Sequence, residues 1–477
     1  MVFSSAIFLF LFLPIVLLGH WFAGQRLRNL FLLLASLIFY AWGEGTYVVV
    51  MILSIICNYF FGRLLDSTVW QNQRKLLLGI MLALNLLPLL YFKYFIFLLN
   101  NINQLLDTGA QINVPDQIHL PIGISFFTFQ AMSYLIDVYR RTSKAQQSVF
   151  SVGLYIALFP QLIAGPIVRY HDIAEQIKKR VQTFTLFASG VERFIFGLGK
   201  KMLIANPLGY IADSIFSLPA GELTLLTAWL GIVCYALQIY FDFSGYSDMA
   251  IGLGRMLGFR FLENFNFPYV AGSIREFWQR WHMSLSGWFR DYLYIPLGGN
   301  RHGSLITARN LFIVFLICGL WHGASWNFII WGLLHGSFLV LERGRWGNIL
   351  NALPKVLQHC YVLIIILTTW VFFRAETLDL SLDYLSSMYS WPDTWSLHAK
   401  IAIKLDIEFY VTLLLGALLS TPLYRLFANK LNNKFIMESK INDVILLGKT
   451  MLLSIVFIMV SMEIANGSYN PFIYFRF

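Results

Sequence analysis

The sequence predicts an all-α polytopic membrane protein with about 10–12 transmembrane helices, together with re-entrant and interfacial helices. The first observation is composition: of 477 residues, 58% are hydrophobic and 13% are charged, whereas soluble domains carry about 25% charged residues. The second is a mean hydropathy of +0.65. The third is that apolar runs near the length of a membrane-spanning helix, about 20 residues, recur along the whole chain. These observations exclude an ordinary soluble enzyme.

The apolar segments follow one another without a polar linker between them. They occupy roughly 3–23, 29–42, 46–62, 76–99, 118–138, 147–165, 184–205, 223–243, 309–341, 357–374, 405–424 and 443–463. Because no shift in composition divides the chain, we expect a single membrane-embedded domain over residues 1–477 that ends in an aromatic tail at 464–477. No positive charge precedes the first apolar segment, so we expect a retained first helix and not a cleaved signal peptide.

The distribution of Lys and Arg between the loops predicts orientation, because cytoplasmic loops carry the excess of these residues. Loops expected inside contain Arg26 and Arg28, Arg63 with Arg74 and Lys75, Arg140 with Arg141 and Lys144, and the segments 255–309 and 425–440. Loops expected outside, which carry little or no positive charge, are 100–117, 206–222 and 375–400. This assignment places both termini outside.

Two places depart from simple alternation. Lys178, Lys179 and Arg180 follow the segment 147–165 on the side where alternation predicts no positive charge, and Pro and Gly end that segment. A broken or re-entrant helix would reconcile the charges. The segment 309–341 has positive charge at both ends and is too long for one crossing, so we expect a hairpin with its bend near His322 to Asn327.

His322 is the residue that most favours a functional site. It lies in Gly-Leu-Trp-His-Gly at 319–323, inside a charge-free stretch from Leu311 to Leu341, and an ionisable group at membrane depth is costly to keep. Imidazole suits a general base that takes a proton from an attacking hydroxyl. The alternative is a buried histidine that makes one hydrogen bond between helices. His335, 13 residues later on the opposite face of a continuous helix, is expected to be structural unless the helix bends.

The segment 277–290 interleaves aromatic residues with arginines around His282. This pattern favours a helix lying at the cytoplasmic interface, with Trp at headgroup level and Arg reaching into water. Arginines in and around it that could contact the phosphates of an anionic acyl donor are Arg255, Arg260, Arg275, Arg280, Arg290 and Arg301. The alternative is that they serve only topology or lipid contacts.

Several other chemistries lack support in the sequence. The four cysteines, Cys57, Cys234, Cys318 and Cys360, have no metal-ligand spacing. No phosphate-binding loop on a strand–helix unit and no His-Glu-x-x-His motif occurs. Asp242 and Asp248 flank a glycine at a helix end, and we expect structural roles for them, as caps of the backbone or as partners of arginines in the next segment. The C-terminal sequence 470–477 is rich in aromatic residues, as in an outer-interface belt, or as in a peptide that folds back into a pore.

The chain resembles the membrane-bound O-acyltransferases, and within them the bacterial alginate O-acetyltransferase-like branch. The resemblance runs nearly end to end through 1–5, 120–126, 162–166, 240–252, 277–286, 290–301 and 319–323. It implies a ring of tilted helices around a thin centre, with a tunnel that joins the two faces. The location implied is the bacterial cytoplasmic (inner) membrane.

The resemblance also implies the chemistry. The family's catalytic histidine falls on His322, and a second histidine of this branch falls on His282. An acetyl group would pass from a cytoplasmic thioester, acetyl-CoA or an acyl carrier protein, to an extracytoplasmic hydroxyl for O-acetylation of a cell-surface polysaccharide. Arg280, Arg290 and Arg301 are candidate donor-binding residues. No bound cofactor, no metal and no nucleic acid are expected.

The tail is similar to the aromatic end of a small partner in the related D-alanylation system, whose tyrosine resembles an acyl relay. Tyr474 is therefore a candidate acyl acceptor. The implied partner is an extracytoplasmic acetyltransferase or acyl-relay protein, in addition to membrane lipids. Alginate, cellulose and peptidoglycan all stay open as the final glycan. Two alternatives stay open as well: a proton-coupled transporter or flippase that uses buried histidines, and a scaffold that has lost catalysis.

Overall fold

The computed structural model describes residues 1–106, 112–219, 221–391, 395–423, 439–467 and 469–471. Helices make up the secondary structure of these residues, with no β-strand among them. The chain divides into two compact units: Met1–Arg193 with Ala250–Leu262, and Phe194–Met249 with Glu263–Phe477. The all-α class predicted from composition is therefore confirmed, and each unit is described by itself below.

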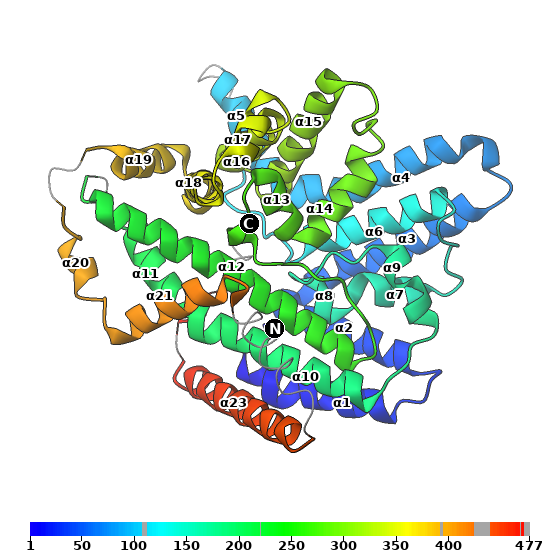
Figure 1. The fold of residues 1–477 in the computed structure, drawn as a ribbon. Helices are drawn as coiled ribbons and strands as arrows, with labels where there is room; N and C mark the ends of the chain where they lie inside the picture. Colours follow the sequence, from blue (N-terminus) through cyan, green and yellow to red (C-terminus); the bar gives the residue numbers. More distant parts are fainter. Residues whose placement is uncertain (107–111, 220, 392–394, 424–438, 468, 472–477) are drawn as a thin grey trace. The chain divides into compact units, whose positions relative to one another are not determined.

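The first unit is built around α6, whose residues are almost all buried. Its helices are η1 (Phe8–Phe12), α1 (Leu13–Phe22), α2 (Arg28–Glu44), α3 (Val48–Asp66), α4 (Arg74–Leu89), η4 (Leu90–Tyr94), α5 (Phe95–Leu105), α6 (Ile124–Tyr139), α7 (Val149–Ala157), α8 (Phe159–Leu162) and α9 (Tyr170–Lys178). Both α3 and α4 lie against α6 (Figure 1). Gly62 on α3 makes this possible, because a Cβ there would lie 2.3 Å from the Tyr134 hydroxyl.

The second unit holds the histidines. Two helices, α10 (Phe184–Gly199) and α12 (Leu225–Met256), belong partly to each unit. The others are η5 (Lys200–Ala205), α11 (Asn206–Phe216), α13 (Ile274–Arg280), α14 (Met283–Phe289), η7 (Arg290–Tyr294), α15 (Ser304–His322), α16 (Trp326–Leu341), α17 (Arg345–Ala352), α18 (Lys355–Arg374), α19 (Leu378–Tyr389), α20 (Ala399–Ala402), α21 (Ile407–Leu419) and α23 (Ser439–Ala465).

The helices are long and apolar enough for a multi-pass membrane protein. Six spans among the described residues qualify by length and composition: Arg28–Asp66, Gln71–Leu105, Leu225–Met256, Ser304–His322, Lys355–Arg374 and Asp443–Ala465. Two of them, Arg28–Asp66 and Gln71–Leu105, each contain two successive helices. Shorter apolar helices at Phe8–Phe22, Trp326–Leu341 and Ile407–Leu419 add to these.

The break predicted within 147–165 is present. Helix α7 ends at Ala157, Leu158 leaves the helical region with φ −55° and ψ 112°, and a single turn, α8, follows. Residues 152–168 are buried throughout. Irregular backbone is stable at such depth because the surrounding protein, and not lipid, satisfies its polar groups.

The hairpin predicted within 309–341 is also confirmed. Helix α15 ends at His322, three residues turn the chain, and α16 begins at Trp326 and returns against α15 (Figure 1). Glycines bring the two backbones together: a Cβ at Gly319 would lie 2.2 Å from the Phe328 carbonyl oxygen, and one at Gly332 would lie 2.3 Å from that of Phe315. This close approach is why small residues recur beside the histidine.

The interfacial helix expected over 277–290 is wrong. The segment forms two short helices, α13 and α14, separated by His282 in the left-handed region at φ 44° and ψ 52°. Phe277, Trp278 and Trp281 are buried. The aromatic pattern suited a headgroup-level surface equally well, but here the rings fill a protein core.

Candidate active site

The imidazole of His322 is enclosed by aromatic rings. Its ring centroid lies 5.0 Å from those of Trp331 and Phe373, in edge-to-face contacts, and 5.0 Å from that of the neighbouring Trp321. The residue is 6% exposed. It is placed there by its position at the end of α15, where the chain turns toward α16. This environment holds the ring by shape and keeps bulk water away from it.

His282 is held by a polar clamp on one side and by aromatic rings on the other. Its Nδ1 lies 3.0 Å from Oδ1 of Asn264. Its ring packs edge-on against Phe243, with centroids 4.6 Å apart. The backbone at His282 is left-handed, a conformation that non-glycine residues adopt rarely and often at functional sites.

The clamp determines the tautomer of His282. Asn264 Oδ1 accepts a hydrogen bond from the backbone N–H of Ser284, at 3.3 Å, and Asn264 Nδ2 donates to the hydroxyl of Ser247, at 3.0 Å. Because a backbone N–H can only donate, the oxygen of Asn264 faces His282, and His282 Nδ1 must carry the proton. The other ring nitrogen, Nε2, is then an acceptor, and it is buried without a hydrogen-bond partner among the described residues.

The charge state of His282 follows from its burial. Removal from water lowers the pKa of His282 to about 3, because the charged form loses most by desolvation. The ring is therefore neutral at pH 7, with a lone pair on Nε2. Such a group accepts a hydrogen bond from a substrate hydroxyl or takes its proton.

Trp321 connects the two histidines. Its ring centroid lies 6.2 Å from that of His282 and 5.0 Å from that of His322. The structure therefore brings together the two histidines that lie 40 residues apart in the sequence.

His335 joins the same aromatic cluster, which the spacing argument did not anticipate. Because the hairpin turns the chain back, His335 lies 4.9 Å from Trp331, the ring that also contacts His322. Its Nδ1 accepts a hydrogen bond from the indole N–H of Trp278, at 3.2 Å. This contact links α13 to α16, and the structural role expected for His335 stays a prediction; its Nε2, like that of His282, is buried without a hydrogen-bond partner among the described residues.

The candidate donor-binding arginines lie in different surroundings. Arg290 lines a cavity of about 220 Å³, together with Arg275 and Arg343. Arg280 does not line it and instead pairs with Glu276, at 2.8 Å. Arg301 lies exposed in the turn after η7 and is not part of this cavity either. Of the three predicted arginines, Arg290 is the one that lines this cavity, and its guanidinium also pairs with Asp291, at 2.8 Å.

This cavity reaches toward the aromatic cluster through one residue. Trp278 lines its wall and donates to His335. Its other lining residues include Phe315, Cys318 and Leu339 on the hairpin. The combination of an apolar wall with three guanidinium groups is suited to an acyl chain attached to an anionic carrier.

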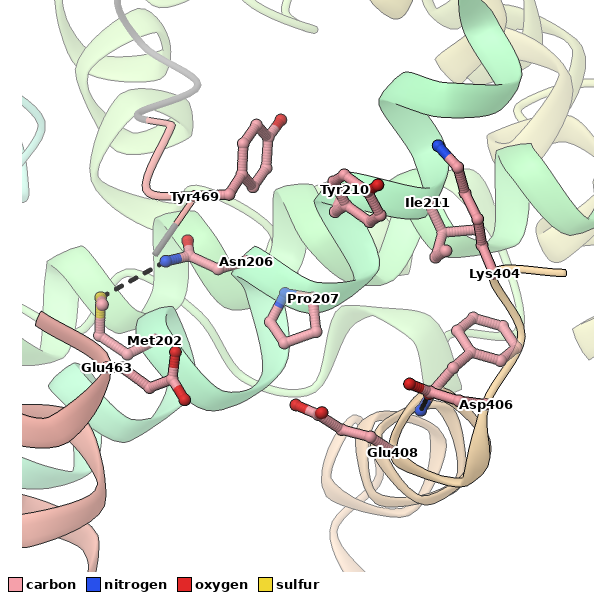
Figure 2. Close-up of a pocket in the computed structure, with 11 residues that line it drawn as sticks. Met202, Asn206, Pro207, Tyr210, Ile211, Lys404, Asp406, Glu408, Glu463 and Tyr469 are labelled. Atoms are coloured by element: carbon pink, nitrogen blue, oxygen red, sulfur yellow. Dashed lines mark hydrogen bonds between the residues drawn. The ribbon is translucent and has the colours of Figure 1, made fainter. Parts of the chain in front are cut away.

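The first residues of the tail are anchored within the second unit. Figure 2 shows Tyr469 beside Asn206 and Tyr210, around a cavity of about 230 Å³. The hydroxyl of Tyr469 donates to Asp213, and Asn206 Nδ2 lies 3.3 Å from Asn470 Oδ1. Tyr474 itself lies outside the described residues.

A buried ion pair receives the tail backbone. Lys201 Nζ lies 2.7 Å from Oδ1 of Asp242, and both side chains are almost completely buried. The same ammonium group donates to the carbonyl oxygen of Pro471. Asp242 precedes Phe243, the ring that contacts His282. Adjacent residues of α12 thus contact the lysine that holds the tail and the ring of His282.

Asp248 is also paired, with Lys200 at 2.6 Å. The two aspartates therefore have structural partners, as expected, although these are lysines of η5 and not arginines of the following segment.

The residue that sequence reasoning missed is Asn264. A polar amide beside Phe265, in the segment Leu262 to Phe267, was the available signal. No group of three or more potential metal ligands occurs among the residues that the structure describes.

Comparisons with known proteins identify relatives of the whole chain. Residues 140–373 match the model of the membrane-bound O-acyltransferase family. A probable alginate O-acetylase of Pseudomonas aeruginosa is 46% identical over 83% of this chain and 76% of its own length. One of Pseudomonas putida is 40% identical over the full length of both. A peptidoglycan O-acetyltransferase of Helicobacter pylori is 38% identical over 81% of this chain and 80% of its own length.

Proposed function

The chain belongs to the membrane-bound O-acyltransferase family and is a multi-pass membrane acyltransferase, and from that premise we propose that it O-acetylates a cell-surface polysaccharide. The acetyl group would come from a cytoplasmic thioester, acetyl-CoA, and pass to an extracytoplasmic hydroxyl. The protein would lie in the bacterial cytoplasmic membrane with both termini outside. The names of relatives that act on alginate and on peptidoglycan support this substrate class.

The observation that carries the proposal is the pair of buried histidines on Trp321. Each is enclosed by aromatic rings, and one of them, His282, keeps an Nε2 lone pair fixed by Asn264. A buried polar atom without a partner costs free energy, so its retention supports a role toward a substrate. A neutral His282 and a second histidine that contacts the same indole ring match an acyl transfer that needs a base and an orienting acceptor.

The proposed step is a single acyl transfer. His322 takes the proton of the acceptor hydroxyl as its oxygen attacks the thioester carbonyl carbon, and His282 Nε2 accepts a hydrogen bond that orients that hydroxyl beforehand. The tetrahedral intermediate collapses with cleavage of the C–S bond. The proton on His322 passes to the departing thiolate, so that a free thiol and an ester leave, and the enzyme returns to its starting state.

The donor would approach through the cavity at Arg290. Arg275 and Arg343 line this cavity together with Arg290. We therefore propose these two arginines as donor-binding residues in place of Arg280 and Arg301, which do not line it. Guanidinium groups pair with phosphate oxygens in a bidentate manner. Transfer of only the acetyl group across the membrane avoids carrying a charged nucleotide through hydrocarbon.

Tyr474 is proposed as the acyl acceptor that relays acetyl to an extracytoplasmic transferase. The support is the position of the anchor: Pro471 is held at Lys201, beside Asp242 and one residue from the ring on His282. Three residues of extended chain reach about 10 Å. Tyr474 follows this anchor by three positions in the sequence.

The experiment that tests the proposal follows labelled acetyl from acetyl-CoA in membranes that contain the wild type or His322→Ala. We expect a loss of about 10²–10⁴-fold in transfer, as for removal of a general base. His359→Ala, a change at a histidine outside the cluster, serves as the control and should transfer normally. Equal transfer by wild type and His322→Ala would refute His322 as the base, and proton-driven flux without thioester consumption would indicate a transporter.

The relay is tested separately with Tyr474→Phe. Loss of label from the tail peptide together with loss of glycan acetylation is expected, whereas thioester hydrolysis should continue. Tyr469→Phe is the matched control, because that hydroxyl is already bonded to Asp213. Full glycan acetylation by Tyr474→Phe, with no acetylated tail in the wild type, would contradict the relay without affecting the role of His322.

A further inference from the structure

A third cavity, in the first unit, lies far from His282 and His322 in sequence and is lined by positive charge. Its volume is about 870 Å³. It is bounded by α1, by the loop before α2, by the segment 178–183 and by the last turn of α12. Five cationic residues line it: Arg28, Lys178, Lys179, Arg180 and Arg255. No aspartate or glutamate is found among the described residues that line it.

Arg180 lies at the centre of this cavity and is held in one orientation. Its NH1 donates to Asn29 Oδ1 at 2.6 Å, and its Nε donates to the carbonyl of Leu257 at 3.2 Å. Its guanidinium plane lies 4.4 Å from the ring centroid of Phe259. Burial and the charge of Arg28 lower the pKa of Arg180 to about 10. The guanidinium of Arg180 therefore remains charged at pH 7. Two cations, Arg28 and Arg180, thus line the same cavity.

Two of these cations, Arg28 and Arg180, have no carboxylate partner among the described residues, whereas Lys178 pairs with Glu175 at 3.2 Å. Neither Arg28 nor Arg180 forms an ion pair with a described residue: the side chain of Arg28 donates to the carbonyl of Ala23, and that of Arg180 to the groups named above. Like charges held together destabilise a protein unless an anion joins them. The cavity is thus built for a negatively charged ligand.

The rim of the cavity indicates the kind of anion. Trp21 on α1 is 72% exposed and Phe184 at the start of α10 is 83% exposed, and both line it. α1 belongs to an apolar helix, Phe8–Phe22. A phospholipid would place its phosphate on the arginines and its acyl chains against these rings. Headgroup phosphates and acyl chains meet at the interface of a bilayer.

We propose that this cavity binds the headgroup of an anionic phospholipid of the membrane in which the protein lies. Arg180 and Arg28 contact the phosphate, Lys179 contacts the outer part of the headgroup, and the acyl chains leave past Trp21 and Phe184. This site is distinct from the arginines at Arg290, which lie in the second unit. The proposal does not depend on the acetyl transfer proposed above.

The site also explains the charges that interrupted the alternation of loops. Asn29, which follows the loop of Arg26 and Arg28, donates to the carbonyl of Ile177 at 2.8 Å, immediately before Lys178. The two positively charged segments therefore lie on one side of the membrane. A lipid that bridges them would hold α2 and α9 in register.

The test measures lipid selectivity of the purified full-length protein in phosphatidylcholine nanodiscs that contain spin-labelled phosphatidylglycerol or spin-labelled phosphatidylcholine. We expect the wild type to prefer phosphatidylglycerol and Arg28→Gln/Lys179→Gln to lose that preference, by about fivefold for each cation removed. Arg26→Gln is the matched control, because Arg26 is exposed in the same loop and does not line the cavity. Unchanged preference in the double variant would overturn the proposal.

A competition arm separates the possible sources of phosphate. Inorganic phosphate and coenzyme A, each at millimolar concentration, should leave the labelled lipid in place. Displacement of phosphatidylglycerol by coenzyme A at low concentration would overturn the lipid assignment and make the cavity a site for a soluble nucleotide. Lipid preference that is retained in coenzyme A and lost in Arg28→Gln/Lys179→Gln would support it.

Discussion

Buried histidines have different neighbours in the histidine cluster of the second unit and in the basic cavity of the first unit. His322 and His282 lie among aromatic rings, whereas His20, in the basic cavity, lies 3.4 Å from a guanidinium nitrogen of Arg180. At His282, burial keeps the imidazole neutral, with a lone pair on Nε2. At His20, the ring lies next to the fixed guanidinium of Arg180. Surroundings, and not residue type, separate a reactive histidine from a structural one.

The two regions also differ in how they treat buried positive charge. Lys201, near the histidines, faces the carboxylate of Asp242 at 2.7 Å. Arg180, in the first unit, has no carboxylate partner among the described residues. The Lys201–Asp242 ion pair contributes to folding without a ligand, whereas a cation without a carboxylate partner leaves a place for an anion. Variants that remove one member of the pair, or one of the unpaired cations, test this comparison.

The largest effect is expected at Lys201. Lys201→Met leaves the carboxylate of Asp242 buried without its partner, which costs about 3–5 kcal/mol. The double variant Lys201→Met/Asp242→Leu should recover most of this stability, because it removes both charges. Thermal unfolding in detergent measures each change. Tail-dependent transfer should stay low in the double variant, since the group that holds the Pro471 carbonyl is absent.

If the double variant regained both stability and transfer, the ion pair would serve folding alone. The matching change in the first unit is Arg28→Gln, which removes a cation that has no carboxylate partner. We expect it to leave the unfolding temperature nearly unchanged while it weakens lipid preference. A large loss of stability in Arg28→Gln would remove the distinction between the two regions.

The next effect is expected at the hairpin. Gly319→Ala introduces a Cβ at 2.2 Å from the backbone oxygen of Phe328, and overpacking of this kind costs about 1–3 kcal/mol. Gly79→Ala on α4 is the control, because nothing lies within 4 Å of a Cβ there. Alanine favours a helix over glycine by about 1 kcal/mol, so the control should gain stability.

Both glycine variants are compared by thermal unfolding and by lipid preference. Gly319→Ala should lower acetyl transfer and leave the preference for phosphatidylglycerol intact. Loss of that preference in Gly319→Ala would mean that the two units do not act separately.

A smaller effect is expected at Asn264, which positions His282. Asn264→Ala removes the acceptor of the Nδ1 proton and frees the tautomer, and we expect transfer to fall by about 10–100-fold, as for other groups that orient a functional histidine. Ser247→Ala is a milder control, because it removes only the group that orients Asn264. The loss should appear in kcat with KM for acetyl-CoA little changed. A change confined to KM would contradict a role in orienting the acceptor.

The smallest effects are expected in pH dependence, and they have opposite signs in the two units. Burial lowers the pKa of His282 to about 3, so its contribution to stability is present above its unfolded pKa of about 6.5 and is lost as pH falls toward 3. A hydrogen bond to Asp137 raises the pKa of His171, so its contribution is present below about 6.5 and is lost as pH rises through the folded value.

Thermal unfolding between pH 5 and pH 8, compared for wild type, His282→Asn and His171→Asn, checks both signs. His282→Asn should flatten the loss on the acidic side, and His171→Asn the loss on the basic side. The effect at His171 is reduced because its side chain is 36% exposed. Two variants that change the same limb of the curve would contradict the assignment.

The sequence supported the fold class, the broken helix at 147–165 and the hairpin at 309–341, because each follows from apolar length, charge and the need to satisfy backbone groups in a membrane. It did not support the description of 277–290, because rings at an interface and rings in a core have the same periodicity. The return of His335 to the cluster was missed because spacing was measured along a straight helix. Asn264 was missed because its role depends on a left-handed turn at His282, which residue type alone does not indicate.

The roles of His322, His282, Tyr474, Arg280, Arg290 and Arg301 stay predictions. Geometry adds support unevenly among them. The two histidines share Trp321, and Arg290 lies at a cavity. Arg280 is engaged by Glu276.

The anchor at Lys201 recognises a main-chain oxygen of the tail and no side chain at position 471. A hydrogen bond to the main chain does not depend on the side chains that follow residue 471. The end of the chain could then be exchanged, lengthened or tagged beyond residue 471 without loss of its attachment point. Changes of sequence beyond residue 471 therefore require no change at Lys201.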